Sequence, residues 1–311
     1  MVTDIVATPL DQCARAVCLC RPAAFGFNPQ TAGTNHLQQA GAGVDDAGAA
    51  IAEFDTLVAR LRASGVRVGV LEDRPEPVRP DAVFPNNWVS FHRDGTCVLY
   101  PMQSENRRLE RRPQDILAVA RELGFIRQRT LDFTVSEAEG RFLEGTGSLV
   151  LDHVQRIAYL ARSPRSDESV AEEWCAQLGY SLEAFDASTT EGDSIYHTNV
   201  LLWIGARVAA VGLDWIAPPD RARVRDRLRA SGRTLVELGT PQLSAFAGNM
   251  LEVQAQDGGT RLVMSRTAAN SLTAEQRQRI YANTDEVIVM DVPVIELRGG
   301  GSVRCMLAEV P

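Results

Sequence analysis

The chain has 311 residues, of which 45% are hydrophobic, and this is enough to bury a large core in one or two domains. The net charge is −8, and basic runs such as residues 107–112 have the pattern of a solvent-exposed helix face. We therefore expect neither nucleic acid nor an anionic membrane as a partner. No apolar stretch approaches the roughly 20 residues that cross a bilayer, and the N-terminus lacks the basic and apolar regions of a signal peptide.

The predicted elements repeat one unit along the chain: a strand that begins with a polar motif, a second strand and an amphipathic helix. The helices carry apolar residues at helical spacing, as between Ile116 and Leu123, and candidate N-caps are Ser166 or Asp167 and Thr273. In chain order the units are 84–91, 96–100 and 105–123; 143–150, 156–160 and 167–178; 197–203, 206–213 and 219–231; 248–253, 260–265 and 273–282; and a strand at 303–310 completed by 16–20 and 45–63.

The polar motifs recur at nearly constant intervals. Asn87, Glu144, His197, Asn249 and Cys305 follow one another at distances of 57, 53, 52 and 56 residues. This regularity predicts one α/β domain over residues 1–311, closed with five-fold pseudo-symmetry, in which strands line a central channel and helices lie outside. The first residues of the motif strands are then expected to converge at the centre.

The cysteine and lysine contents narrow the chemistry. Six cysteines are scattered through a large chain, unlike the dense framework of a small secreted domain, and this predicts a cytoplasmic protein. Cys18 and Cys20 lie on one face of a predicted strand without a second Cys/His pair at metal spacing, so we expect core residues, no metal and no cofactor. All 32 basic residues are arginine, which excludes a Schiff-base lysine, a P-loop lysine and a Ser–Lys pair.

Three residues in phase with the repeat fit covalent catalysis. Cys305 supplies a nucleophile, His197 an acid/base and Glu144 a carboxylate. Each has a plainer interpretation by itself, since most free cysteines are simply buried. Glycines 299–301, directly before Cys305, are poor in regular elements and fit a sharp turn or a close approach to a bound molecule. The shared phase favours an active site.

The motifs resemble those of the guanidino-group modifying superfamily, the penteins, which includes arginine deiminases, dimethylarginine hydrolases and amidinotransferases. Within it the chain is most similar to citrulline-utilisation hydrolases. The resemblance implies a five-bladed α/β propeller, with Cys305 as nucleophile, His197 as general acid/base and Glu144 holding the histidine and the substrate nitrogen. It spans nearly the whole chain and is carried by residues 21–29, 80–92, 142–148, 196–200 and 299–306.

Two departures from the deiminase pattern bear on the substrate. Deiminases carry aspartate at the position of Asn87 and at the position of Asn199. A guanidinium is cationic and offers only donors, whereas a neutral ureido group has an oxygen that an amide can donate to. Leaving a desolvated charge without its partner costs about 3–5 kcal/mol. We therefore expect citrulline to be hydrolysed to ornithine, ammonia and CO2 through a covalent Cys305 intermediate, with His197 protonated beside a Cys305 thiolate.

Further substrate contacts follow from the resemblance. Asp81 is a candidate for the substrate α-amine, and Asn86 is a further substrate-binding candidate. Backbone N–H groups of the Gly299–Ser302 loop, which includes Gly301, are expected to stabilise an oxyanion together with Asn87 and Asn199. The α-carboxylate is left to three candidates, Arg304, Arg141 and Arg162. Asn28 and Asn35 are expected in a lid, and His92 and His153 are expected to be structural or at the surface.

Alternatives stay open at this point. A guanidino hydrolase or deiminase acting on arginine or a modified arginine, and an amidinotransferase, would share the same residues. A non-catalytic propeller used as a binding module, as in pentein-fold translation factors, would have no need of a cysteine, a histidine and a glutamate in phase. The expected partner is a small molecule, and a homo-oligomer is compatible with the sequence.

Overall fold

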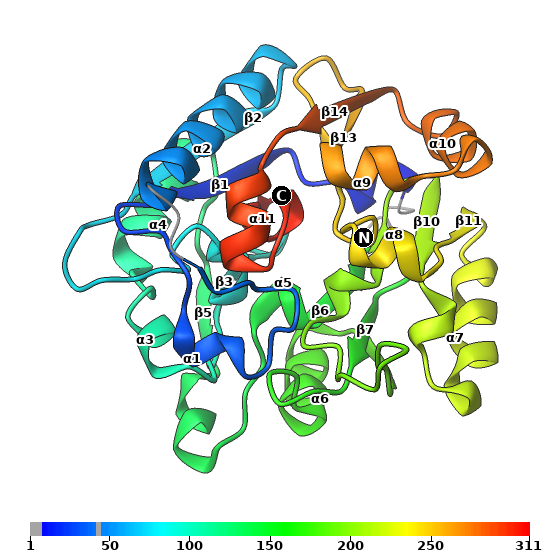
Figure 1. Ribbon diagram of the computed structural model, residues 1–311, viewed down its shortest axis with the longest axis horizontal. Coiled ribbons are helices and arrows are strands. Elements are labelled where there is room, and N and C mark those ends of the chain that lie inside the picture. Colours follow the sequence, from blue (N-terminus) through cyan, green and yellow to red (C-terminus); the bar gives the residue numbers. More distant parts are fainter. Residues whose placement is uncertain (1–7, 42–44) are drawn as a thin grey trace, which may run out of the picture.

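Five small sheets surround the centre of the molecule. The computed structural model describes residues 8–41 and 45–311, and within them the strands form five sheets of three strands each. Figure 1 looks down on these sheets, with helices such as α2 (Asp46–Ala63) and α7 (Pro218–Ala230) at the periphery and α11 (Pro293–Gly299) near the middle. This arrangement is the five-bladed α/β fold that the repeat predicts.

Each blade has the same strand order. The first strand is antiparallel to the middle strand, and the third strand is parallel to it. First strands of neighbouring blades contact one another, which places them around the centre. The blades are β3 (Val89–Phe91), β4 (Thr96–Leu99) and β5 (Arg129–Asp132); β6 (Leu149–Asp152), β7 (Ile157–Ala161) and β8 (Ser181–Phe185); β9 (Leu202–Ile204), β10 (Val208–Val211) and β11 (Thr234–Glu237); β12 (Leu251–Gln254), β13 (Thr260–Ser265) and β14 (Glu286–Met290); and β15 (Ala308–Val310), β1 (Ala16–Arg21) and β2 (Arg67–Glu72).

The fifth blade closes the ring because it joins the two ends of the chain. Ala16 of β1 pairs with Val310 of β15 in an antiparallel ladder. The other blades are continuous in sequence, so only this blade depends on contacts between residues almost 300 positions apart. The predicted strand at 16–20 and helix at 45–63 are therefore confirmed as parts of one blade with the C-terminal strand.

Crossover helices connect the middle and third strands, as parallel pairing requires. Their apolar faces pack inward; on α4, for example, Ile116 and Ala120 are buried. The Asp167 side chain caps α6 by accepting from the Val170 amide, and Thr273 forms a capping box at α10, so both predicted caps are confirmed. The crossover helices are α2, α4 (Pro113–Glu122), α6 (Glu168–Leu178), α7 and α10 (Ala274–Tyr281), and shorter helices are α1 (Pro29–Ala32), α3 (Glu105–Arg108), α5 (Gly145–Ser148), α8 (Thr240–Ser244) and α9 (Arg266–Ser271).

Two features differ from the sequence prediction. The single helix expected over 105–123 is two helices, because Pro113 starts α4 and disfavours helical backbone in the residue before it. The third strand of each blade was not predicted at all. Strand β5, for instance, is mostly exposed, so its sequence carries no hydrophobic signal.

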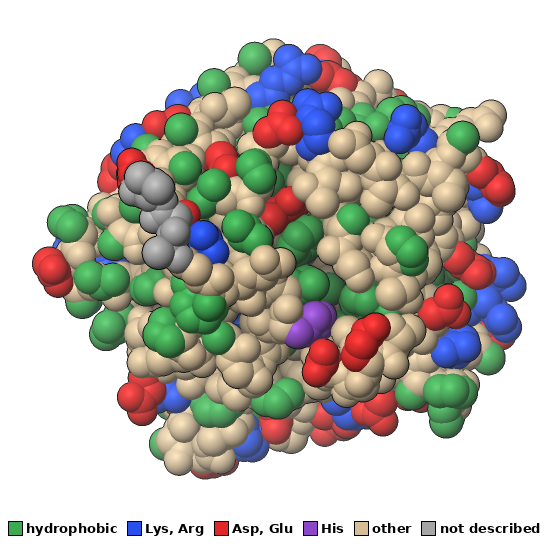
Figure 2. Space-filling view, viewed as in Figure 1, with side chains coloured by type: hydrophobic (Ala, Val, Ile, Leu, Met, Phe, Trp, Pro, Cys, Tyr) green, Lys and Arg blue, Asp and Glu red, His purple; other side chains and the backbone are tan. Residues whose placement is uncertain are grey.

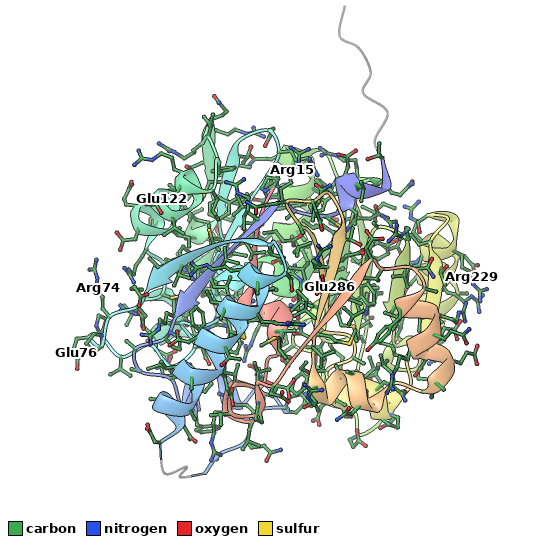
Figure 3. All side chains as sticks on the ribbon, turned by 90° about the horizontal axis from the view of Figure 1, so that it is seen from above. Arg15, Arg74, Glu76, Glu122, Arg229 and Glu286 are labelled. Carbon is green, nitrogen blue, oxygen red and sulfur yellow. The ribbon has the colours of Figure 1, made fainter. Side chains whose placement is uncertain are left out.

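The surface carries most of the charge. In Figure 2 the charged side chains lie mainly around the rim of the face shown, and the middle is mostly apolar or uncharged. Figure 3 shows the labelled Arg74, Glu76, Glu122 and Arg229 projecting outward at the edges. Among the described residues, no helix has the length and apolar character needed to cross a membrane.

Candidate active site

The motif residues lie in or directly before short helical turns and loops that lead into the first strands, not in the strands themselves. The strand expected at 303–310 is a turn that contains Cys305, followed by the short strand β15. One helical turn takes only three or four residues, so it has no periodicity that separates it from a strand start. The turns are η2 (Pro85–Asn87), α5 (Gly145–Ser148), η4 (Thr198–Val200) and η6 (Val303–Met306).

Two asparagine amides contact the Cys305 sulfur. The Nδ2 atoms of Asn249 and Asn199 lie 3.2 Å and 3.6 Å from Sγ. The thiol is only 3% exposed, and burial raises its pKa above the ordinary value, although the Asn249 contact opposes this. Cys305 is therefore a protonated thiol at neutral pH, with two amides placed to stabilise the thiolate when it forms.

The predicted histidine–carboxylate pair has formed. His197 Nε2 lies 2.9 Å from Glu144 Oε2, and the carboxylate accepts a hydrogen bond from Nε2–H, which leaves Nδ1 as the basic nitrogen. Burial lowers the pKa of His197 to about 4 even though Glu144 opposes this. Burial works to raise the pKa of Glu144, but the Arg165 charge and the His197 bond outweigh it and lower the pKa to about 2. The resting pair is thus neutral imidazole with ionised carboxylate, and the expected imidazolium–thiolate pair is not the resting state.

Asn87 presents one free donor. Its Oδ1 accepts from Arg107 Nη1 at 3.0 Å, while its buried Nδ2 has no hydrogen-bond partner. A Cβ atom at Gly147 would lie 2.5 Å from this Nδ2 and 2.7 Å from His197 Nδ1. Only glycine at this position leaves room for both groups.

A small cavity is lined by Cys305, His197 and Asn87, whereas Glu144 and Asn199 lie behind its wall. Its volume is about 20 Å³, roughly that of one water molecule. The N-terminal segment forms one part of the wall, where Asn35 Nδ2 donates to the Gly299 carbonyl at 3.2 Å. The lining residues are Thr31, Asn35, Asp81, Phe84, Asn87, Arg107, Arg165, Tyr196, His197, Gly299, Gly300, Gly301 and Cys305.

The glycine run before Cys305 makes a turn and a close approach. Gly300 has φ +62° and ends α11, where its N–H donates to the Glu296 carbonyl. A Cβ atom at Gly301 would lie 3.3 Å from the Cys305 sulfur and 3.2 Å from the Phe84 ring. The run therefore positions the thiol against the cavity, which a bulkier sequence would not allow.

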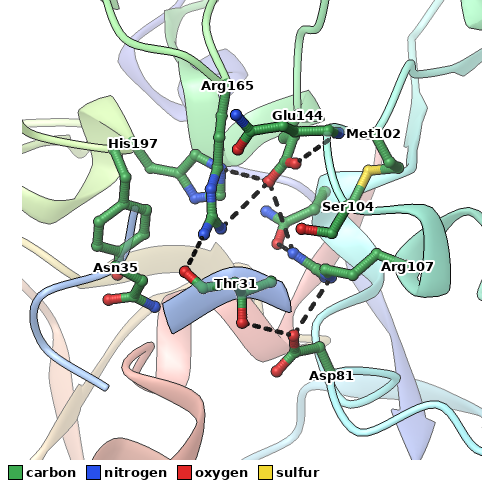
Figure 4. Close-up of polar contacts among 12 residues, drawn as sticks. Thr31, Asn35, Asp81, Met102, Ser104, Arg107, Glu144, Arg165 and His197 are labelled. Atoms are coloured by element: carbon green, nitrogen blue, oxygen red, sulfur yellow. Dashed lines mark hydrogen bonds and ion pairs between the residues drawn. The ribbon is translucent and has the colours of Figure 1, made fainter. Parts of the chain in front are cut away.

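Two arginines that the sequence did not single out enter the cavity. Arg107 belongs to the run that the sequence suggested was a solvated helix face, but it is 2% exposed. Arg165 lies 3.6 Å from Glu144 and donates to the Thr31 carbonyl at 2.8 Å, which links the N-terminal segment to the carboxylate (Figure 4). The sequence does contain a signal for this buried pair, because Arg107 lies three residues before Glu110. However, an ion pair on the surface of a helix has the same spacing, so the spacing alone does not show that this one is buried.

Several predicted contacts have other surroundings. Asn86 is buried with both amide atoms unpartnered, and it does not line the cavity. Asp81 does line it, with Oδ2 held by Asn28 Nδ2 at 2.7 Å and Oδ1 free. The three arginine candidates for the carboxylate do not line the cavity, because Arg304 pairs with Glu309, Arg141 with Glu139, and Arg162 with Glu168.

Two other histidines, His92 and His153, lie away from the cavity. His92 and His153 line a separate hollow at the opposite ends of the blades, where His92 contacts Ser90 and His153 contacts Tyr180. In residues 8–41 and 45–311, no group of three or more His, Cys, Asp or Glu side chains is arranged to hold a metal ion.

A family model identifies the chain. The model described as N,N dimethylarginine dimethylhydrolase, eukaryotic, matches residues 21–311. The chain belongs to this family. Its members are pentein guanidino-modifying enzymes, so the resemblance to the pentein superfamily noted in the sequence is confirmed.

Solved structures share the fold of this dimethylhydrolase family member at low identity. The N-terminal domain of ArgZ, a cyanobacterial arginine dihydrolase, in a cysteine-to-serine mutant bound to substrate, matches with TM-score 0.68 and 16% identity over 95% of this chain and 97% of that chain. AgrE with L-arginine matches with TM-score 0.71 and 15% identity over 95% of this chain and 40% of that chain. A dimethylarginine dimethylaminohydrolase adduct matches with TM-score 0.63 and 15% identity over 95% of this chain and 99% of that chain.

The chain spans 39% of the longer ArgZ chain. At these identities the solved structures establish the fold alone. No curated protein matches the chain in sequence.

Proposed function

We propose that the protein hydrolyses the ureido group of citrulline through Cys305 and releases ornithine, ammonia and CO2. The observation that carries the proposal is the state of the Asn87 amide. Its oxygen is occupied by Arg107, so the unpartnered Nδ2 is the atom left to meet a substrate. A donor at this place suits a carbonyl oxygen and opposes a guanidinium, which offers only donors.

The carboxylates of the site support the same substrate. Glu144 is already engaged by His197, Arg107 and Arg165. Asp81 lies on the far side of Arg107 from Glu144, at 3.7 Å from that arginine, and its free Oδ1 suits the substrate α-ammonium. No carboxylate of the cavity wall is then left for a guanidinium, whereas a neutral ureido group needs none.

The proposed reaction begins with a proton transfer. His197 Nδ1 takes the proton of Cys305 as Sγ bonds to the ureido carbon, and the Asn87 amide donates to the developing oxyanion. A C–N bond then breaks, and the leaving nitrogen takes the proton from His197. Water activated by His197 then cleaves the thioester-like intermediate and releases a carbamate. The carbamate loses CO2, which breaks the second C–N bond. The overall reaction consumes one water.

The test is to incubate the protein separately with citrulline, arginine and N,N-dimethylarginine, and to measure ammonia and the amino-acid product. We expect ornithine from citrulline alone. Cys305→Ser should abolish turnover, whereas Cys97→Ser, at a buried cysteine of β4 outside the cavity, should retain it. Full activity of Cys305→Ser, or unchanged citrulline turnover in Asn87→Asp with Asn199→Asp, would contradict the proposal.

A second candidate is hydrolysis of arginine or a methylated arginine. It is favoured by the family description, by the arginine dihydrolase ArgZ and by AgrE with L-arginine. Ornithine formed from arginine would indicate a dihydrolase, citrulline formed from arginine a deiminase, and citrulline formed from dimethylarginine a dimethylarginine hydrolase. Product that appears only with an added amine acceptor would indicate an amidinotransferase.

A further inference from the structure

A buried ion pair lies directly behind the candidate active site. Glu110 is 3% exposed and binds Arg107 through both oxygens, with Oε1 to Nε at 2.8 Å and Oε2 to Nη2 at 3.0 Å. Such a two-bond arrangement fixes the plane of a guanidinium as well as its position. Glu110 does not line the cavity, so any effect on the reaction passes through Arg107.

Arg107 uses its remaining nitrogen on the active site. Nη1 donates to Asn87 Oδ1 at 3.0 Å, and the same guanidinium lies 3.6 Å from Glu144 and 3.7 Å from Asp81 (Figure 4). An amide can be turned so that oxygen and nitrogen exchange places, and the neighbouring groups decide which one faces a ligand. Here the arginine holds the oxygen, so the unpartnered nitrogen is the donor that this residue of the cavity wall can offer.

We propose that Glu110 is a positioning residue that sets substrate selectivity. Glu110 fixes Arg107, Arg107 holds the Asn87 oxygen, and Asn87 Nδ2 is thereby kept as a donor for substrates with a carbonyl oxygen. This inference rests on the proposed ureido chemistry. Without the pair, the Asn87 amide is free to turn its oxygen toward the cavity, and that orientation suits the donor-only guanidino group.

The test is Glu110→Gln, which keeps the side-chain size and removes the charge. We expect kcat/KM for citrulline to fall about tenfold to a hundredfold, as for the loss of a residue that orients an active-site group, and the citrulline-to-arginine ratio to fall with it. Glu183→Gln is the matched control, because Glu183 is a buried glutamate of β8 that pairs with Arg223 and Arg227 in another blade. This control should leave the ratio unchanged.

A double-mutant cycle with Asn87→Ala separates positioning from general damage. If Glu110 acts through Asn87, Glu110→Gln has little further effect once Asn87 is alanine. Additive losses, or a lower citrulline rate with an unchanged substrate ratio, would overturn the inference. Thermal unfolding of each variant, and partial rescue by Glu110→Asp, exclude a folding defect as the cause.

Failure of the inference can be told from failure of the proposed function. If arginine and not citrulline is hydrolysed, the proposed function is wrong, and the same cycle measured on arginine still tests the coupling of Glu110 to Asn87. If no amino acid is turned over, the rate of Cys305 alkylation by chloroacetamide, a neutral amide, takes the place of kcat/KM. Slower alkylation in Glu110→Gln that disappears in the Asn87→Ala background supports the inference, and an unchanged rate contradicts it.

Discussion

At the scale of single residues, burial sets the protonation of the site before any substrate binds. It raises the pKa of the Cys305 thiol and lowers the pKa of His197 to about 4, and both shifts favour uncharged groups. The imidazole is therefore a free base at neutral pH, held by Glu144 in the tautomer whose Nδ1 can accept a proton. Attack and proton transfer are expected to occur together, because no thiolate is present at rest.

This protonation predicts the pH profile. Since His197 must be neutral to accept the proton, its ionisation should make kcat/KM rise as the pH increases through about 4. An ordinary histidine would place the rise near pH 6.5, at about its unperturbed pKa. The check is kcat/KM for citrulline from pH 3 to 9, in the unchanged protein and in Glu110→Gln, which removes the carboxyl whose pKa burial raises to about 7. A rise centred above pH 6 in both proteins would show that the site stabilises imidazolium and would contradict the neutral resting pair.

At the scale of elements, the crossover helix α6 is stabilised where it begins. The Asp167 side chain accepts from the Val170 amide at 3.0 Å and from the Ser169 hydroxyl at 2.6 Å at the start of α6. The adjacent Ser166 hydroxyl is buried without a partner, so it makes no cap. Of the two cap candidates in the sequence, the structure therefore selects the aspartate.

Removing this cap should destabilise the protein without changing its chemistry. We expect Asp167→Ala to lower the free energy of unfolding by about 1 kcal/mol, because an N-cap substitution typically costs this much. Ser166→Ala is the control and should cost less. Urea denaturation of both variants measures the difference, and equal losses would show that the cap contributes nothing.

At the scale of the whole molecule, one glutamine ties two blades together at the end away from Cys305. Gln12 Nε2 donates to the carbonyls of Leu151 and Ile204 at 2.8 Å and 3.2 Å, and its oxygen accepts from the His153 amide at 2.9 Å. Arg233 donates to the same oxygen at 3.3 Å. These contacts join the blade of β6 to the blade of β9 through residues close to the N-terminus.

Gln12→Ala should therefore lower stability more than activity. It leaves a buried amide and two carbonyls without this partner, and we expect a loss of about 2 kcal/mol in the free energy of unfolding. Gln254→Ala is the control and should have a small effect, because the side-chain amide of this half-buried residue donates to the Gly258 carbonyl in a surface turn. A drop in kcat/KM for Gln12→Ala at a temperature where the variant is folded would show that the two ends of the channel are coupled.

The sequence by itself determined the repeat, the five-bladed fold and the positions of Cys305, His197 and Glu144 within it. Evenly spaced polar motifs are a one-dimensional signal, and strands and capped helices follow from local patterning. Short outer strands such as β5 were missed because their residues are mostly exposed.

Only the tertiary structure decided the surroundings of those residues. Arg107 and Arg165 enter the cavity from segments whose sequences suggest surface helices and loops, and the candidates Arg141, Arg162 and Arg304 form ion pairs elsewhere. The charge of His197 and the orientation of the Asn87 amide depend on burial and on neighbours from other blades. Both properties depend on many contacts between residues that are distant in sequence, and the local sequence pattern does not reveal those contacts.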